Sequence, residues 1–134
     1  MNCIIAGSRG ISKALTYKGI EACPFAAQIT TVYSGMCPDS PDIYGVEWAV
    51  ENGIPWREYY ANWHNLNEKP CKIRYNKYEK PYNVLAGFNR NTRMIEAGAE
   101  ALIVIWDGKS NGSQDMLDKA IAANLQYFVY PPLT

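Results

Sequence analysis

Residues 101–113 read ALIVIWDGKSNGS, a continuous apolar run that ends abruptly in a loop of Asp, Gly, Lys, Ser and Asn. An apolar run without alternation, and in part β-branched, is typical of a strand buried on both faces of a parallel sheet. The loop after it would lie at the carboxyl end of the strand, where open α/β sheets bind ligands. Its glycines let backbone approach an anion, and the helix that follows begins with unpaired N–H groups. This stretch therefore predicts an anion-binding loop in an α/β domain.

The N-terminus repeats the same design. Residues 3–6 (CIIA) form a short apolar run that is followed at once by Gly7, Ser8, Arg9 and Gly10. If the two loops face one another at the same edge of a sheet, they form a site for a nucleotide or a sugar phosphate.

The rest of the chain alternates between strand-like and helix-like patterns. Strands are predicted at residues 3–6, 29–33, 54–59, 101–106 and 127–130, and helices at residues 12–22, 43–52, 89–98 and 113–124. Such alternation requires parallel βαβ units with right-handed crossovers. We therefore predict an α/β fold, a Rossmann-like three-layer sandwich around a parallel sheet of about five strands in the order 3-2-1-4-5. Pro55 limits the third strand to its opening residues or to an edge of the sheet.

Composition narrows the classes of function. The 134 residues, of which 48% are hydrophobic, suffice for one domain. The formal net charge of zero argues against a broad nucleic-acid-binding face. No run approaches the roughly 20 apolar residues that span a bilayer, and no secretory signal is visible, so we expect neither a membrane partner nor export. The four cysteines lack CxxC spacing and His64 is the only histidine. We therefore expect reduced thiols in a cytoplasmic protein, with no metal site and no cofactor.

Residues 62–83 break the pattern, because Lys, Asn, Tyr and Pro dominate there without a regular period. A structureless loop of this length is rare in a compact domain, so the segment is a lid, a small hairpin or an interface element. Its mixture of aromatic and basic residues is superficially typical of nucleic-acid contact. Its own carboxylates, Glu68 and Glu79, and the neutral chain as a whole argue against that interpretation.

A series of short motifs resembles a known family. The motifs are Gly7-Ser8-Arg9, Ser34-Gly35, Asp42 with Gly45 and Trp48-Ala49, Gly53-Ile54-Pro55, Ala61-Asn62-Trp63, Ala86-Gly87 with Arg90-Asn91 and Met94, and residues 106–113. In order and spacing they resemble the YspA-type (cpYpsA-related) family of the SLOG superfamily of Rossmann-like domains. The match covers nearly the whole of a single domain, residues 1–134, apart from an insertion at about residues 65–85. One departure is the loop at residues 35–42, which contains two prolines where the family carries a Gly- and Arg-rich loop and therefore offers fewer N–H donors.

The resemblance implies two classes of function. The superfamily includes the Lonely Guy phosphoribohydrolases, proteins that process DNA during transformation, and sensors of cyclic ADP-ribose-like signals in phage defence. Relatives commonly pair, which implies a homo-oligomer. Arg90 falls on the arginine that Lonely Guy enzymes use, and Asp115 lies at about the position of their catalytic glutamate, one methylene shorter. These two residues are the predicted catalytic pair.

The predicted ligand-binding residues are Gly7, Ser8, Arg9, Ser34, Gly35, Asp42, Arg90, Asn91, Asp107, Gly108, Ser110, Gly112 and Ser113. A guanidinium near a helix N-terminus can hold a phosphate through two parallel hydrogen bonds. Each residue also has an ordinary structural interpretation: Asp, Gly and Ser serve turns and helix caps, Arg90 could form a surface ion pair, and Asp115 could complement a helix dipole.

Three functions therefore stand in order of preference. The first is binding of a nucleotide or nucleotide-sugar ligand, with NAD- or ADP-ribose-derived molecules among the candidates, at the carboxyl ends of the first and fourth strands. The second is an N-glycoside hydrolase that acts on nucleoside 5′-monophosphates. The third is a ligand-free scaffold or DNA-processing partner.

Overall fold

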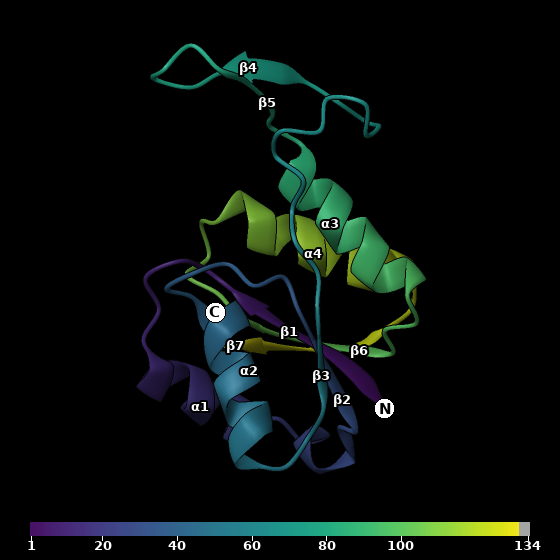
Figure 1. Ribbon diagram of the computed structural model, residues 1–134. Coiled ribbons are helices and arrows are strands. Elements are labelled where there is room, and N and C mark those ends of the chain that lie inside the picture. The colour runs from purple at the N-terminus through teal and green to yellow at the C-terminus, as the bar shows by residue number, and fades with distance from the viewer. Residues whose placement is uncertain (132–134) are drawn as a thin grey trace.

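The computed structural model describes residues 1–131 and contains a five-stranded, fully parallel sheet with helices on both faces (Figure 1). The sheet is formed by β1 (Asn2–Gly7), β2 (Thr31–Ser34), β3 (Trp56–Glu58), β6 (Ala101–Ile105) and β7 (Gln126–Tyr130). Their spatial order is β3-β2-β1-β6-β7. Because β6 and β7 are the fourth and fifth strands of this sheet along the chain, the predicted α/β class and strand order are confirmed.

Four α-helices form the outer layers, namely α1 (Lys13–Ala22), α2 (Pro41–Glu51), α3 (Ala86–Glu96) and α4 (Asn111–Ala122). One core cluster joins α1 and α2 to one face of the sheet through Ile20, Trp48 and the β1 residue Ile5. The other joins α3 and α4 to the opposite face through Met94 and Met116. All of β6 is buried because its alternate side chains enter both clusters, which explains its unalternating apolar sequence.

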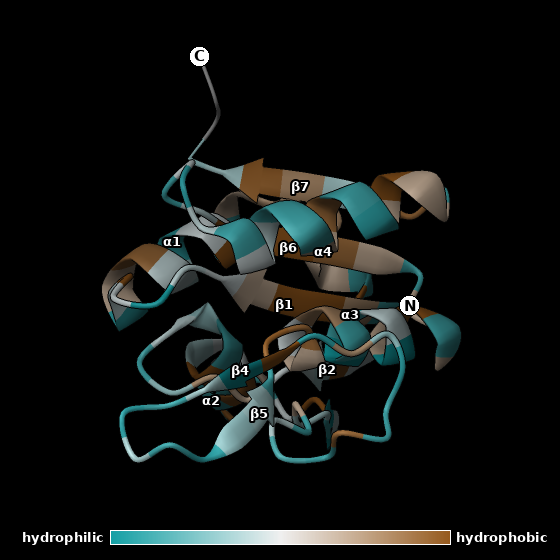
Figure 2. Ribbon diagram, turned by 90° about the horizontal axis from the view of Figure 1, so that it is seen from above, coloured by the Kyte–Doolittle hydropathy of each residue, from teal (hydrophilic) through white to brown (hydrophobic). Residues whose placement is uncertain are grey.

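The distribution of hydropathy follows these layers. In Figure 2, β1 and β6 are brown over much of their length, whereas α4 turns a largely teal side outward. Within residues 1–131, no helix combines the length and the apolar character needed to cross a bilayer.

Serine caps set the start of three helices. The side chains of Ser12, Ser40 and Ser110 accept hydrogen bonds from backbone N–H groups in the first turns of α1, α2 and α4. After α2, Gly53 adopts a φ of 66°, as expected for a glycine just beyond a helix end.

Several predicted boundaries need correction. The second strand begins at Thr31 rather than Ile29, because a short 3-10 helix, η1 (Ala26–Gln28), takes up the chain before it. The third strand keeps only three residues, which follow Pro55 at the edge of the sheet. The last three helices begin earlier than predicted, at Pro41, Ala86 and Asn111.

The irregular segment contains a small hairpin, one of the three alternatives that the sequence left open. Strands β4 (Ile73–Tyr75) and β5 (Pro81–Asn83) pair in antiparallel fashion and form a sheet of their own. In Figure 1 this hairpin lies beyond α3, far from the main sheet.

Candidate functional site

The loops that follow β1 and β6 meet, as the sequence predicts. Gly7 pairs with Ile105 in the strand register, and the Ser8 N–H donates to the Ile105 carbonyl over 3.0 Å. In return, the Asp107 N–H donates to the Ser8 hydroxyl over 3.1 Å. The carboxyl ends of the two strands therefore lie side by side at the switch point of the sheet.

A cavity of about 150 Å³ opens between these loops and the helices α3 and α4. Eight of the predicted ligand-binding residues line it: Gly7, Arg9, Asp42, Arg90, Asn91, Ser110, Gly112 and Ser113. Ala6, Met94 and Met116 supply its apolar lining. Two guanidinium groups and one carboxylate face this space, so its lining is suited to an anion. We call this space the anion cavity.

Arg90 is the cation whose bonding is incomplete. Its Nη1 donates to the Gly35 carbonyl over 3.2 Å, and its Nη2 donates to the Asn91 Oδ1 over 3.3 Å. Its Nε is buried and has no hydrogen-bond partner among the described residues. A buried donor without an acceptor is costly, and an anion within hydrogen-bond distance of Nε would remove that cost.

The N-terminus of α4 adds backbone donors. The Ser110 hydroxyl accepts the Ser113 N–H over 3.4 Å, which leaves Asn111 and Gly112 as the first-turn N–H groups without an intrahelical acceptor. Asn91 Nδ2 approaches the Gly112 carbonyl at 3.4 Å and so ties α3 to this end of α4. The helix dipole and these amides favour a negative charge here.

Asp42 is the buried acid of the cavity. Its carboxylate accepts the N–H groups of Gly7 over 3.3 Å and Cys37 over 3.2 Å. Burial raises the pKa of Asp42, and the charge of Arg90 lowers it in part. An ideal Cβ on Gly35 would lie 2.8 Å from both Arg90 Nε and Asp42 Oδ2, so only glycine at this position lets the two side chains come this close.

The first loop contributes less than expected. We expected its backbone N–H groups to point into the cavity, but those of Gly7, Ser8 and Gly10 donate to Asp42, Ile105 and Asp39. These amides are therefore already used within the protein. The donors available to a ligand come from Arg9, Arg90 and the start of α4.

Five predicted residues do not line this cavity: Ser8, Ser34, Gly35, Asp107 and Gly108. Ser34 is buried, and its hydroxyl donates to the Asp42 carbonyl over 2.8 Å. The Asp107 carboxylate accepts the N–H groups of Lys109 and Ser110 over 2.8 and 2.9 Å, and these bonds lower its pKa. Both side chains therefore stabilise the loops. This agrees with the alternative role in turns and helix caps that the sequence offers for Asp and Ser.

Asp115 also lies outside the anion cavity lining. Its two carboxylate oxygens accept from Lys119 Nζ over 2.8 and 2.6 Å, and Asn91 Nδ2 donates to it over 2.9 Å. The carboxylate is thus neutralised by a lysine of its own helix. It contacts Asn91, which lines the cavity, but does not line the cavity itself.

A second hollow of about 320 Å³ adjoins the anion cavity and shares Arg9, Cys37 and Arg90 with it. We call it the rim hollow. Tyr60 and Trp63 line it, and the Trp63 side chain is 44% exposed. Trp106 is buried and donates to the Ser110 carbonyl, so Trp63 is the exposed indole beside the site.

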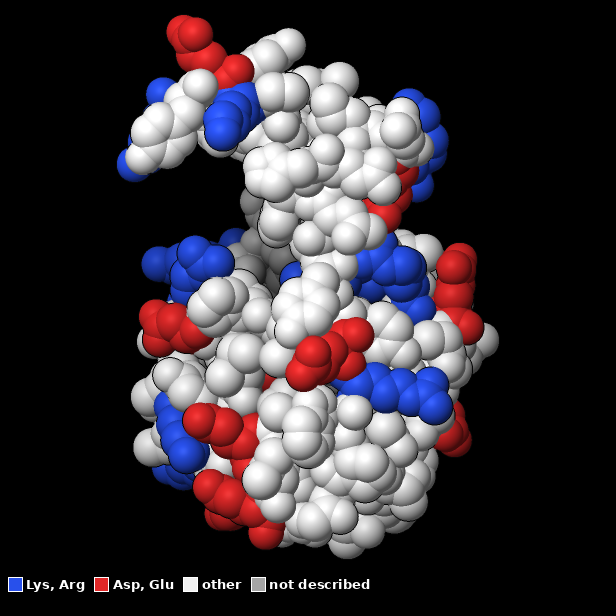
Figure 3. Space-filling view, in the orientation of Figure 1, with Lys and Arg blue, Asp and Glu red and all other residues white. Residues whose placement is uncertain are grey.

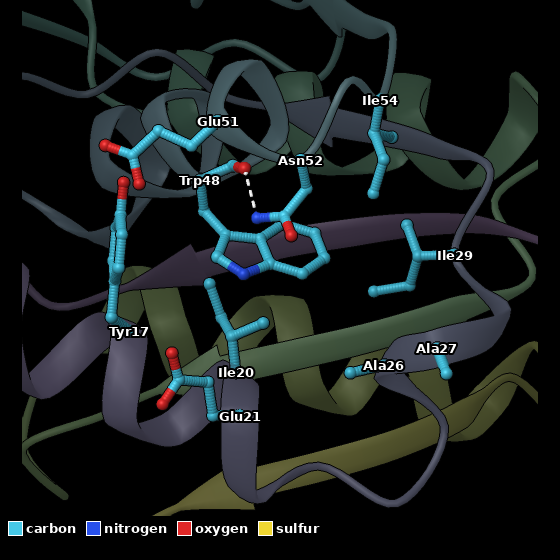
Figure 4. Close-up of a pocket in the computed structure, with 10 residues that line it drawn as sticks. All are labelled: Tyr17, Ile20, Glu21, Ala26, Ala27, Ile29, Trp48, Glu51, Asn52 and Ile54. Atoms are coloured by element: carbon cyan, nitrogen blue, oxygen red, sulfur yellow. Dashed lines mark hydrogen bonds between the residues drawn. The ribbon is translucent and has the colours of Figure 1, made fainter.

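A larger cavity, of about 410 Å³, lies elsewhere (Figure 4). It opens between α1, α2 and η1, next to Ile29 and Ile54, which precede β2 and β3. Figure 4 shows Glu21 and Glu51 on one side of the Trp48 indole, and Ile29 and Ile54 on the other. Carboxylates line this cavity and no Lys or Arg does, so it is not suited to an anion.

No family model matches this sequence, and no curated protein or solved structure is significantly similar to it. Membership of the SLOG superfamily therefore stays a prediction from the motifs. Within residues 1–131, no group of three or more His, Cys, Asp or Glu side chains is placed to hold a metal ion.

The raised pKa of Asp42 predicts a pH dependence of stability. A carboxyl group whose pKa is higher in the folded state than its ordinary value of 3.8 contributes stability while protonated, and this contribution is lost as pH rises through the folded pKa. Asp42→Asn lacks this titration. The difference in free energy of unfolding between variant and wild type should therefore shift in favour of the variant as pH rises from about 4 towards neutrality.

Urea denaturation at several pH values measures this shift. Asp118→Asn, which removes the same charge from the exposed face of α4, is the control and should show a flat profile by comparison. A flat or opposite slope for Asp42→Asn would contradict the raised pKa.

Proposed function

We propose that this protein binds the phosphate group of a nucleotide or nucleotide-sugar ligand in the anion cavity. The observation that carries the proposal is the Arg90 side chain, which lines a cavity shared with the first turn of α4 and whose buried Nε has no partner among the described residues. Arg9 adds a second positive charge at the same place. Guanidinium groups and helix N-termini are recurrent phosphate ligands.

The sizes of the two hollows indicate how such a ligand would lie. Sites for small-molecule ligands usually measure about 300–1,000 Å³, so the anion cavity of about 150 Å³ suits one end of a nucleotide rather than the whole. The rim hollow supplies the remaining space. We therefore place the phosphate in the anion cavity and the sugar and base in the rim hollow, where Trp63 offers a surface for stacking.

Binding without turnover fits the geometry better than hydrolysis. An N-glycosidase needs a carboxylate against the developing oxocarbenium ion. Asp115 is engaged by Lys119, and Asp42 is engaged by two backbone N–H groups. Neither carboxylate is free to stabilise that charge, so the hydrolase remains a second hypothesis without structural support of its own.

Isothermal titration calorimetry against inorganic phosphate, ribose 5-phosphate, AMP, ADP-ribose and adenosine tests the proposal. AMP should bind more tightly than phosphate, and adenosine should bind least because it lacks the anion. Chromatography of the AMP sample should show no free adenine. Folded protein that binds none of these compounds, or binds adenosine as well as AMP, would refute the proposal.

Cys37 provides an independent reporter of occupancy. It lines both hollows, and its sulfur lies 3.5 Å from Arg9 Nη2. AMP at about ten times its Kd should slow alkylation of Cys37 by iodoacetamide by about tenfold, because only unoccupied protein reacts. Peptide mass spectrometry measures the rate at each cysteine.

Cys71 is the matched control, because it is also partly exposed but lies beside the hairpin and lines neither hollow. Its alkylation should proceed at the same rate with and without AMP. Equal protection of both cysteines would indicate a global effect and contradict occupancy of the rim hollow.

A further inference from the structure

The hairpin and its flanking residues form a strongly basic segment. We define the basic arm as residues 69–82. It contains one carboxylate, Glu79, and five cationic side chains: Lys69, Lys72, Arg74, Lys77 and Lys80. Because the whole chain has a formal net charge of zero, the remainder of the molecule carries the compensating negative charge. Positive charge is therefore segregated onto this arm.

Glu68, which precedes the arm, does not neutralise it. From the sequence alone, Glu68 would offset part of the positive charge beside it. In the structure its carboxylate turns away to α3, where it pairs with Arg93 Nη1 over 3.0 Å and accepts from Asn62 Nδ2 over 2.7 Å. Its side chain is 18% exposed. Glu68 is thus bound to the body and leaves the arm positive.

All five cations of the arm are exposed, and none forms a salt bridge within residues 1–131. Two aromatic side chains stand among them, Tyr75 at 69% and Tyr78 at 70% exposed. Lys77 Nζ lies 5.1 Å from the centre of the Tyr78 ring. Basic and aromatic side chains therefore follow one another along an accessible segment.

The arm is also held in place at its base. Asn83 is fully buried, and its Oδ1 accepts the N–H groups of Lys72 and Leu85, each over 3.0 Å. Its Nδ2 donates to the Pro70 carbonyl, which also accepts from Asn89 of α3 over 2.9 Å. The arm therefore stands out from the body as a fixed projection (Figure 1). In Figure 3, blue side chains are spread along it, whereas red ones are more frequent over the lower body.

We propose that the basic arm binds single-stranded nucleic acid. Lys and Arg side chains would contact successive phosphates, and Tyr75 and Tyr78 would stack on bases, a combination that binds single strands with little sequence preference. Exposed tyrosines find partners in splayed bases but not in the closed stack of a duplex. A membrane partner is disfavoured, because insertion needs a broad apolar face and Ile73 is the arm's one large exposed aliphatic side chain.

Fluorescence anisotropy of the full chain with labelled dT15 and rU15 tests this proposal. Binding of either polymer should be strong at 50 mM salt and weaken with a slope of log K against log salt of about −3, as expected for four phosphate contacts on a single strand. The double variant Arg74→Glu/Lys77→Glu should lose at least tenfold in affinity. Tyr75→Ala/Tyr78→Ala should also lose about tenfold or more, because stacking on each base contributes comparably.

Lys18→Glu/Lys109→Glu makes the same charge change at exposed positions outside the arm and should retain more affinity than the arm variant. Circular dichroism and thermal melting establish that each variant is folded. Three results would overturn the proposal: no binding at 50 mM salt, equal loss in both charge variants, or equal affinity for a 15-base-pair duplex. Binding to anionic phosphatidylserine vesicles that exceeds binding to dT15 would also overturn it in favour of a membrane partner.

Discussion

Arg90→Ala should lower the affinity for AMP by roughly 30- to 1,000-fold, the range expected when a buried, charge-assisted contact worth about 2–4 kcal/mol is removed. The guanidinium is held by the Gly35 carbonyl and the Asn91 amide oxygen, so its orientation is fixed before any ligand arrives. Preorganisation of this kind concentrates binding energy in one side chain. Calorimetry with AMP and with inorganic phosphate measures the loss, which should appear for both because the phosphate is the shared group.

Two further variants make this test specific. Arg57→Ala removes a guanidinium that stacks on Tyr33 at the edge of the sheet, away from both hollows, and should leave AMP affinity unchanged. Arg90→Lys keeps the charge but loses the planar fork, so it should fall between wild type and Arg90→Ala. Arg90→Ala protein that melts cooperatively and binds AMP as tightly as wild type would remove the proposed site.

Gly7→Ala should reduce the free energy of unfolding by about 3 kcal/mol or more, because the added methyl group has no space. An ideal Cβ at Gly7 would lie 2.2 Å from the Ile105 carbonyl oxygen and 2.4 Å from Pro41 Cγ. The first is backbone of the neighbouring strand and the second is a rigid ring at the start of α2. Neither can move without separating β1 from β6 or lifting α2 from the sheet.

Gly112→Ala provides the matched control for this prediction. The nearest atom to a Cβ there, Ser110 Oγ, lies 4.0 Å away, and the residue lies in the first turn of α4. The helix propensity of alanine exceeds that of glycine by up to about 1 kcal/mol, so this variant should be as stable as wild type or slightly more stable. Urea denaturation compares the two, and a Gly7→Ala variant of wild-type stability would contradict the close packing of β1, β6 and α2.

The fold could be predicted because its signals are local. The apolar run of β6 and the strand–loop–helix repeats specify a parallel sheet, and Ser12 caps α1 at the residue where the sequence predicts that helix to begin. The start of α3 could not be predicted, because its N-cap is Leu85, which supplies no side-chain acceptor. The extent of β2 depended on η1, a 3-10 turn without a distinctive sequence pattern.

The candidate site was predictable only in part, for a different reason. Loop residues at strand ends are brought together by topology alone, so Arg9, Asp42 and Ser110 could be assigned to one place from the sequence. The sequence does not reveal which polar groups are already satisfied within the protein. Ser8 and Asp107 belong to that satisfied group. Trp63 was missed because it comes from a segment without periodicity, and Tyr60 because it lies between that segment and a predicted strand; the position of both depends on tertiary packing.

The anchoring of Asn83 has a practical consequence for engineering this chain. Within residues 1–131, residues 76–79 at the tip of the hairpin make hydrogen bonds only among themselves and with Lys80, so an affinity tag inserted there disturbs no hydrogen bond to the body. Excision of the whole basic arm, residues 69–82, is a different operation. It would deprive Asn89 of the Pro70 carbonyl, and Asn89 is the residue directly before Arg90. A truncated chain would therefore differ from the parent beside the proposed phosphate contact, and a graft at the tip is the safer design.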